Sequence, residues 1–407
     1  MPKAGYVNPS GKHLPAVART NDSPLSIAML CDSFGALGGV AQIVEDLAAE
    51  FARAGHRVAI ISNPHKGTSI GRRPNPAVEQ VWVDLPRTKP FSLRHPERLW
   101  RGRTASQLAA FIRQWTPDLV NIHGGLRDRF PAVIAACMKT KIPIVQSFHL
   151  VPQPLHEGGE AARLNNLSSM ALRAACAITF PSTAVKAGFR EISPEAEHAR
   201  IIRGGVNLEH AARAMPLVRR RPYIFSASRL DLRHKAVDVV IEAFGLLSEE
   251  FPEVDLLIAG DGPQQSEIEE MIAACRLEAR IHLLSSLPHD DLWSLYKGAL
   301  LFVMLSRMAE GLPLVFFEAM ACGTPVIGTR NGGIPEILIH NETGMLLERN
   351  QPGDAAAAMR TLLGNPLWRE RIGRRGREFV EKYDWEAVAA HYLALYQQLC
   401  PSGQTKI

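Results

Sequence analysis

The chain has 407 residues, of which 46% are hydrophobic and 21% are charged, and its formal net charge at pH 7 is +5. That length is too great for one ordinary hydrophobic core and predicts two domains of about 200 residues each. The mildly basic balance is compatible with an anionic ligand or a membrane surface. It is weak evidence for a nucleic-acid partner, and we expect none.

The first 25 residues contain no apolar run of signal-peptide length, so we expect a disordered N-terminal extension over residues 1–25. No window approaches the roughly 18 consecutive apolar residues that a membrane-spanning helix needs. The six cysteines lie far apart and form no CxxC pair, which predicts reduced core thiols and neither disulfides nor a zinc site. These features together favour a cytoplasmic protein.

Strands and helices alternate along the chain. The first series is predicted to contain strands at 25–34, 56–62, 117–125, 142–150 and 175–182, with a glycine turn at 35–40 and an amphipathic helix at 41–55. The second series is predicted to contain strands at 223–230, 254–263, 279–284, 300–305 and 324–329 and helices at 236–250, 265–276, 290–299 and 313–322.

The strands are apolar on both faces, as parallel sheets require. The pattern therefore predicts an α/β protein with two doubly wound domains and a ligand at the carboxyl ends of the strands. The Pro- and Arg-rich segment 213–222 is the best linker candidate, which places the domains at 26–215 and 216–385.

The first glycine turn, GALGGV, lacks the GxGxxG spacing of a dinucleotide-binding loop. The second strand also ends in Ser62 and Asn63, where a ribose-binding acid would stand, so a hydride-transfer enzyme is not expected. Gly38 and Gly39 still permit an anion to approach the backbone at the following helix N-terminus. The alternative is that they serve tight turn geometry alone.

One glutamate, Glu318, stands in the almost wholly apolar stretch 313–322. On a helix it would share a face with Leu314, Val315, Ala321 and Cys322. Burying an unpaired carboxylate costs several kcal/mol, about 2–7 for a polar group and more for a charge, so a partner is expected. A ribose diol offers two hydroxyl donors to such a carboxylate.

Two cations are predicted at the same sheet edge. Arg229 closes the first strand of the second domain, and Lys235 stands in the loop that enters the next helix. Both should lie at the carboxyl edge, where a phosphate would sit, although a loop lysine is often simply solvated. Cations for a diphosphate and a carboxylate for a diol describe a nucleotide.

The segment EGLPLVFFE, residues 310–318, places Glu310 and Glu318 in an EX7E motif. It occurs in order with SRLDLRHKAVDVVIEAF, IAGDGP, FEAMACGTPVIGT, NGGIPEIL and NETGMLL. This set resembles family 4 of the retaining glycosyltransferases over roughly residues 26–400. The resemblance implies the GT-B architecture of two facing Rossmann-like domains, with a C-terminal helix, residues 386–407, that packs back on the first domain.

The resemblance also implies roles for individual residues. Glu318 would hold the ribose hydroxyls, Glu310 would face the transferred sugar, and Arg229 and Lys235 would neutralise the diphosphate. From the first domain, His149 would touch the donor sugar and His123 would belong to the acceptor side. The backbone groups implied in sugar and phosphate binding belong to Gly38, Gly39, Gly311, Leu312, Leu314 and Val315.

The implied reaction moves a sugar, with retention, from a nucleotide-diphosphate sugar to an acceptor hydroxyl. A UDP-sugar or GDP-mannose is the expected donor, the acceptor is a glycan, a glycolipid or a small molecule, and no metal or other cofactor is expected. The base would stack near residues 283–288. A nucleotide-sugar 2-epimerase of GT-B architecture is the alternative, and a non-catalytic sugar-nucleotide-binding protein is a third. Starch- or sucrose-type synthases are not expected, because the chain lacks their extra length.

A basic segment between His65 and Arg103 suggests how an acceptor could be delivered. It interleaves arginines and lysines with Phe91, Leu93, Leu99 and Trp100. One interpretation is a solvated loop and helix with no further role. The other is that this segment contacts the anionic inner face of a membrane and presents a lipid-linked acceptor.

Overall fold

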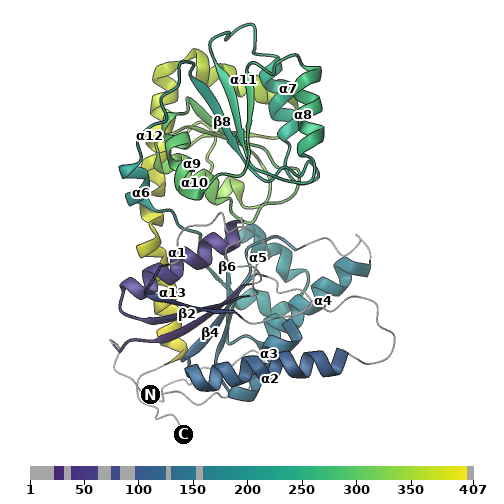
Figure 1. Ribbon diagram of the computed structural model, residues 1–407, viewed down its shortest axis with the longest axis vertical. Coiled ribbons are helices and arrows are strands. Elements are labelled where there is room, and N and C mark those ends of the chain that lie inside the picture. Colours follow the sequence, from purple (N-terminus) through teal and green to yellow (C-terminus); the bar gives the residue numbers. More distant parts are fainter. Residues whose placement is uncertain are drawn as a thin grey trace. The chain divides into compact units, whose positions relative to one another are not determined.

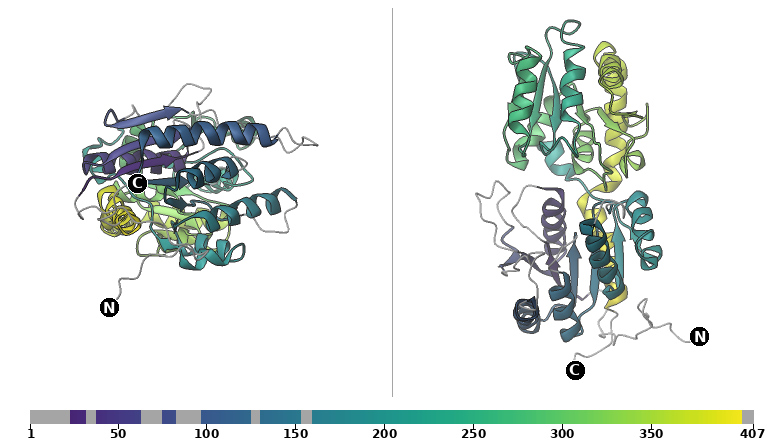
Figure 2. Two further views of the ribbon diagram at one scale, coloured as in Figure 1. Left: turned by 90° about the horizontal axis from the view of Figure 1, so that it is seen from below. Right: turned by 90° about the vertical axis from the view of Figure 1, so that its right-hand side faces the viewer.

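The computed structural model describes residues 23–31, 38–62, 75–82, 97–124, 130–152 and 159–400. Within these ranges the chain forms two compact units, which we call unit 1 (up to Arg203, and from Trp385 onwards) and unit 2 (Gly204–Asp384). Each unit is a parallel sheet with helices on both faces (Figures 1 and 2). The α/β fold with two doubly wound units is therefore as predicted.

Unit 1 contains a seven-stranded sheet in the order β3-β2-β1-β4-β5-β6-β7. Its strands are β1 (Ser26–Leu30), β2 (Arg57–Ser62), β3 (Val78–Trp82), β4 (Leu119–His123), β5 (Ile144–Ser147), β6 (Ala177–Phe180) and β7 (Arg200–Ile201). Its helices are α1 (Gly39–Arg53), α2 (Glu97–Trp115), α3 (Phe130–Thr140), α4 (Gly159–Ala174), α5 (Thr183–Arg190) and α13 (Trp385–Leu399), with a 3₁₀ helix at Pro194–His198.

Unit 2 contains a six-stranded sheet in the order β10-β9-β8-β11-β12-β13. Its strands are β8 (Tyr223–Ala227), β9 (Asp255–Ala259), β10 (Ile281–Leu284), β11 (Leu301–Met304), β12 (Val326–Thr329) and β13 (Met345–Leu347). Its helices are α6 (Leu208–Arg213), α7 (Val237–Gly245), α8 (Gln265–Ala274), α9 (His289–Gly298), α10 (Leu314–Ala321), α11 (Pro352–Gly364) and α12 (Pro366–Val380), with 3₁₀ helices at Ile334–Glu336 and Glu381–Tyr383.

Strand residues alternate between two apolar layers in each unit. In unit 2, Ile224 and Leu256 belong to a core shared with α7, α8 and α11, whereas Phe225 and Leu257 belong to a core shared with α9 and α10. Both sheets reverse their strand order at a central pair, between β1 and β4 in unit 1 and between β8 and β11 in unit 2. Ligands of doubly wound sheets bind at such switch points, outside the carboxyl ends of the strands.

The C-terminal helix α13 returns to unit 1, as the resemblance implied, and lies beside α1 (Figure 1). It is held by a buried polar network on one face of the sheet. Asn121 Nδ2 donates to the Tyr396 hydroxyl, Ser147 donates to Asn121 Oδ1 over 3.0 Å, and Thr179 donates to Ser147 over 2.7 Å. The neighbouring strands β4, β5 and β6 thus each contribute one polar residue to the network that contacts α13.

The boundary between the units differs from the predicted one at 215/216. The chain passes into unit 2 at Gly204, because the segment that follows packs there. Val206 and Ala211 are buried in the core with α9 and α10, and Lys297 donates to the carbonyl oxygen of Ala211 over 3.0 Å. The Pro- and Arg-rich run 213–222 is therefore an internal connection of unit 2. Residues 1–22 and 401–407 lie outside the described residues.

All six cysteines are free, and only Cys275 is exposed. This agrees with the prediction of reduced core thiols. In the described part of the chain, no helix is both long and apolar enough to cross a membrane.

Candidate active site

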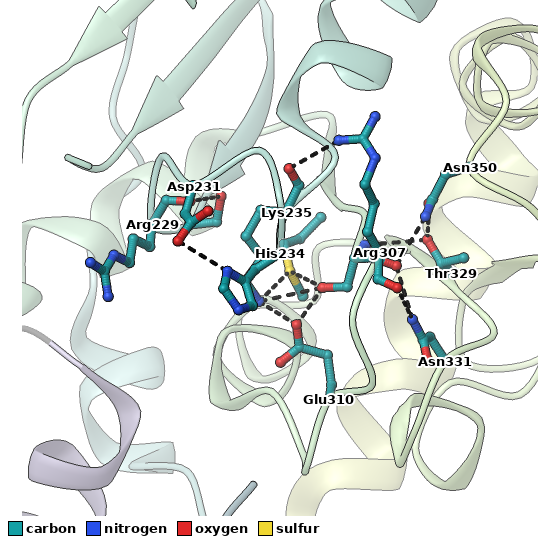
Figure 3. Close-up of polar contacts among 12 residues, drawn as sticks. Arg229, Asp231, His234, Lys235, Arg307, Glu310, Thr329, Asn331 and Asn350 are labelled. Carbon is teal, nitrogen blue, oxygen red and sulfur yellow. Dashed lines mark hydrogen bonds and ion pairs between the residues drawn. The ribbon is translucent and has the colours of Figure 1, made fainter. Parts of the chain in front are cut away.

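Glu310 and Lys235 meet at the carboxyl edge of the sheet in unit 2 (Figure 3). Lys235 precedes α7, and Glu310 lies between β11 and α10. The lysine Nζ is 2.5 Å from Glu310 Oε1, and their side chains are 18% and 17% exposed. Ser306, which is fully buried, donates its hydroxyl to the same carboxylate oxygen. The pair is therefore largely withdrawn from water, where attraction between charges is stronger than at an open surface.

Arg229 lies at the same edge but does not join this pair. It follows β8 and is exposed, and Figure 3 shows its guanidinium extending away from Lys235 and Glu310. The intervening turn is held by Asp231, whose carboxylate contacts His234 Nδ1 at 3.0 Å and Arg233 Nε at 3.3 Å. The structure thus brings Lys235 to a carboxylate and leaves Arg229 as an exposed cation.

The backbone around Glu310 is supported by the following loop, between β12 and the 3₁₀ helix at Ile334–Glu336. Gly333 N–H donates to the carbonyl oxygen of Glu310 over 2.8 Å. Gly332 has a φ of +57°, and a Cβ there would lie 2.1 Å from that same carbonyl oxygen. Only a glycine allows this approach, because any side chain would collide with the backbone of Glu310.

Two asparagines hold the backbone at Ser306, four residues before Glu310. Asn331 and Asn350 both donate to the carbonyl oxygen of Ser306, over 3.2 and 3.0 Å. Thr329 donates to Asn350 Oδ1 over 2.6 Å (Figure 3). Sequence reasoning did not assign these residues. The signals were that Thr329 ends the FEAMACGTPVIGT segment and that Asn331 stands in the NGGIPEIL segment.

Glu318 lies on α10, where the apolar pattern predicted it, and is 5% exposed. Its carboxylate has partners from α9 that the sequence did not reveal. His289 Nε2 lies 2.7 Å from Oε1, and the Tyr296 hydroxyl donates to Oε2 over 2.9 Å. Burial and the adjacent Glu318 carboxylate hold the pKa of Tyr296 well above its usual value, so this tyrosine remains a neutral donor.

The segment between the two glutamates turns into α10, whose first residue is Leu314. Gly311, Leu312 and Leu314 are buried, and Val315 is half-buried. The first amides of an α-helix have no carbonyl partner within the helix, so those of Leu314 and Val315 are available donors at a positive helix end. Pro313, the N-cap residue, has no N–H to contribute.

In unit 1, Gly38 is the N-cap of α1 and Gly39 its first residue, and both are exposed. They stand where the first glycine turn was predicted, at the carboxyl side of β1. Residues 32–37 of that turn lie outside the described residues.

His123 and His149 form a buried pair at the carboxyl ends of β4 and β5. His123 Nδ1 lies 3.0 Å from His149 Nε2, and the rings stack at 5.3 Å with an interplanar angle of 6°. Burial lowers the pKa of His149 to about 4 and lowers that of His123 well below its usual value. His123 Nε2 and His149 Nδ1 have no hydrogen-bond partner within the described ranges. The sequence analysis assigned His149 and His123 separate roles, but it did not predict that they are in contact.

No group of three or more His, Cys, Asp or Glu side chains among the described residues could hold a metal ion. Lys235 and Arg229 bring two of the cationic side chains at this edge. Of the basic segment 65–103, most residues lie outside the described ranges, and Glu97–Trp115 forms α2.

Two Rossmann-like α/β units in one chain make up the GT-B fold of glycosyltransferases. The architecture matches solved structures at low sequence identity. These include the sucrose-phosphate synthase of Thermosynechococcus elongatus, with a TM-score of 0.77, 23% identity and coverage of 92% of this chain and 99% of that one. They also include Anabaena HepE in complex with UDP and glucose, with a TM-score of 0.72, 18% identity and coverage of 91% and 99%.

The family is given by two sequence models. The model described as "Glycosyltransferase Family 4" matches residues 37–210, and "Glycosyl transferases group 1" matches residues 210–379. The chain belongs to the family 4 glycosyltransferases.

Two relatives match over nearly their whole length. A glycogen synthase of Mycobacterium tuberculosis is 27% identical over 88% of this chain and 91% of its own length. The N-acetyl-alpha-D-glucosaminyl L-malate synthase of Bacillus anthracis is 26% identical over 91% and 96%. The expectation that length separates this chain from synthases was wrong, because proteins named glycogen synthase and sucrose-phosphate synthase match it nearly end to end.

Proposed function

We propose that this glycosyltransferase moves a sugar, with retention of its anomeric configuration, from a nucleotide-diphosphate sugar to an acceptor hydroxyl. The observation that carries the proposal is the arrangement of the two glutamates of one segment. Glu318 is buried and held by two donors, and Glu310 is paired with Lys235 at the carboxyl edge of the same sheet. One carboxylate suits a ribose diol, and the other lies beside a cation suited to a diphosphate.

In the proposed reaction, the bond between the anomeric carbon and the diphosphate oxygen breaks as the acceptor oxygen bonds to the same face of that carbon. The acceptor's proton passes to a phosphate oxygen of the leaving group. Lys235 and Arg229 stabilise the negative charge that develops there, with the amides of Gly311, Leu312, Leu314 and Val315. Glu310 faces the transferred sugar. From unit 1, His149 contacts the sugar, and Gly38 and Gly39 contact the phosphates.

A UDP-sugar is the favoured donor, with GDP-mannose as the second candidate. The support for UDP is that the structurally similar HepE was solved with UDP and glucose. The acceptor is a glycan, a glycolipid or a small molecule, since relatives include both a glycogen synthase and a malate-glycosylating enzyme by name. No metal or other cofactor takes part in the proposal, because cationic side chains and helix amides supply the positive field.

The test is a panel of UDP- and GDP-sugars, with and without acceptors, followed by NMR. We expect slow donor hydrolysis or transfer, with a product whose anomeric configuration equals that of the donor. Inversion would contradict the retaining reaction. Conversion of the donor into its 2-epimer without acceptor would instead establish the nucleotide-sugar 2-epimerase alternative.

We further propose that the enzyme works in the cytoplasm and contacts an anionic membrane through the basic segment 65–103. Each basic residue near such a surface contributes about 1 kcal/mol, so binding should be salt-sensitive. Liposome co-sedimentation should separate the natural protein from a variant with Arg94, Arg98, Arg101 and Arg103 changed to Ser. Equal, salt-independent partitioning of the two proteins would favour a soluble acceptor.

A further inference from the structure

His289 opens helix α9, and its ring contacts the carboxylate of Glu318 on the neighbouring helix α10. Tyr296, two helical turns after His289, contacts the other oxygen of the same carboxylate. Residues at this spacing lie on one face of a helix, so a single face of α9 holds both oxygens of Glu318. The rings of His289 and Trp293 pack in a T-shaped arrangement, with centroids 5.7 Å apart and an interplanar angle of 88°.

The chemistry of these groups sets which atoms carry protons. An ionised carboxylate only accepts hydrogen bonds, so His289 Nε2 must carry the proton in its contact with Glu318. The Tyr296 hydroxyl donates to the second oxygen. A carboxylate offers about four acceptor directions, so it can accept from His289, from Tyr296 and from further donors. One oxygen is thereby oriented by His289 and the other by Tyr296.

His289, Glu318 and Tyr296 are all largely buried, so the orientation of the Glu318 carboxylate depends on its protein donors. The side chain of His289 is 16% exposed and that of Glu318 is 7% exposed, and Tyr296 is fully buried. Water has little access with which to replace a lost donor, and a glutamate has several rotatable bonds that must be held in one arrangement. Removal of the His289 donor should therefore let the carboxylate turn.

We propose that His289 is a positioning residue that orients Glu318 toward the vicinal hydroxyls of a nucleotide ribose. This inference rests on the proposed function, in which Glu318 binds that diol. It differs from a general structural role in one respect: His289 should matter only for ligands that carry the hydroxyls.

The experiment measures dissociation constants by calorimetry for UDP and GDP and for their 2′,3′-dideoxy counterparts. The proteins are the natural chain, His289→Leu and His289→Gln. We expect His289→Leu to weaken the better ribonucleotide about tenfold or more, the scale of one hydrogen bond to a charged group. Its affinity for the dideoxy nucleotide should stay within about twofold. His289→Gln should recover most of the loss, because its side-chain amide can donate to Glu318.

His282 provides a matched control. It is also a partly exposed histidine of unit 2 beside a carboxylate, with Nε2 3.3 Å from Asp255 Oδ2, but it lies near the amino end of β10. His282→Leu should bind both nucleotide forms as the natural protein does. An equal loss for the ribose and dideoxy ligands in His289→Leu, or no loss, would overturn the inference.

Glu318→Ala separates this inference from the proposed function. If Glu318→Ala loses the hydroxyl-dependent affinity and His289→Leu keeps it, only the role of His289 falls. If Glu318→Ala binds the ribonucleotide as tightly as the natural protein, or if neither nucleotide binds the natural protein, the ribose assignment falls and the inference with it.

Discussion

Lys235 and Glu310 are joined by an ion pair with 2.5 Å between Nζ and Oε1, and the buried hydroxyl of Ser306 donates to the same oxygen. Glu310 is thus neutralised by the residue expected to meet the diphosphate. Glu318, at the other end of the EX7E segment, is instead contacted by His289 and Tyr296 of α9. The two glutamates of one motif therefore sit in different electrostatic surroundings, and their removal should have different consequences.

Glu318→Ala should weaken the binding of both the nucleotide sugar and the free nucleoside diphosphate, because both carry the ribose diol. Glu310→Ala should mainly lower kcat and leave the affinity for the nucleoside diphosphate nearly unchanged. Calorimetry with UDP or GDP and steady-state kinetics measure the two effects. Equal nucleotide affinity in the natural protein and Glu318→Ala would remove the ribose assignment.

Arg229→Ala and Lys235→Ala should each lower turnover about 100-fold, the scale of one electrostatic stabiliser. Their effects on stability should differ. Lys235→Ala leaves the half-buried Glu310 without its cation, which costs about 2 kcal/mol and lowers the midpoint of thermal unfolding by roughly 4–8 °C. Arg229 is exposed, so Arg229→Ala should unfold as the natural protein does.

The exposed Arg233 is the control for this pair, because its side chain is 74% exposed and it pairs with Asp231. Arg233→Ala should change turnover little. A loss of turnover in Arg233→Ala as large as that in Arg229→Ala would show that the effect is one of general surface charge.

Gly332→Ala should damage catalysis without direct loss of a functional group. The new Cβ would lie 2.1 Å from the Glu310 carbonyl oxygen at a φ of +57°, so the segment that carries Glu310 must move. We expect kcat to fall about tenfold or more, since a shift of about 1 Å can cost 100-fold. Gly353→Ala is the control, because a Cβ there meets nothing within 4 Å. Similar kinetics for both alanine variants would count against the supporting role of Gly332.

The His123–His149 pair should make unit 1 sensitive to acid. The pKa of His149 is about 4 in the folded protein, below the value near 6.5 expected when unfolded, so the unfolded chain takes up a proton first as the pH falls. This contribution to stability is complete above about pH 6.5 and is lost toward pH 4. The loss relative to neutral pH amounts to about 2 kcal/mol at pH 5 for His149 alone.

Thermal unfolding of the natural protein and of a His123→Phe, His149→Phe double variant between pH 7 and pH 5 measures this effect. The natural protein should lose stability more steeply. Parallel loss in the two proteins would mean that the pair is already charged when folded or stays neutral when unfolded.

Transfer should continue in the presence of EDTA, because the proposal assigns charge stabilisation to Lys235, Arg229 and helix amides. Turnover with and without chelator, followed by added Mg²⁺, tests this point. Loss of activity in EDTA and its recovery with Mg²⁺ would require a metal in the reaction.

The amino-acid sequence by itself determined the strand and helix alternation, the two doubly wound units and the burial of Glu318. These follow from local patterns: runs of apolar residues, glycine turns, and one carboxylate on an apolar helical face. The helix predicted at 313–322 is α10 at Leu314–Ala321. By contrast β3, β7 and β13 were not predicted. All three are edge strands, and β7 and β13 have only two and three residues, which carry little pattern.

Only the tertiary structure decided which residues meet. Lys235 pairs with Glu310, His289 and Tyr296 hold Glu318, and His123 stacks on His149, and each contact joins residues far apart in the chain. The passage into unit 2 at Gly204 likewise depends on the packing of Val206 and Ala211 against α9 and α10. Such contacts depend on sheet order and helix packing, which bring distant residues to one edge and which no local periodicity encodes.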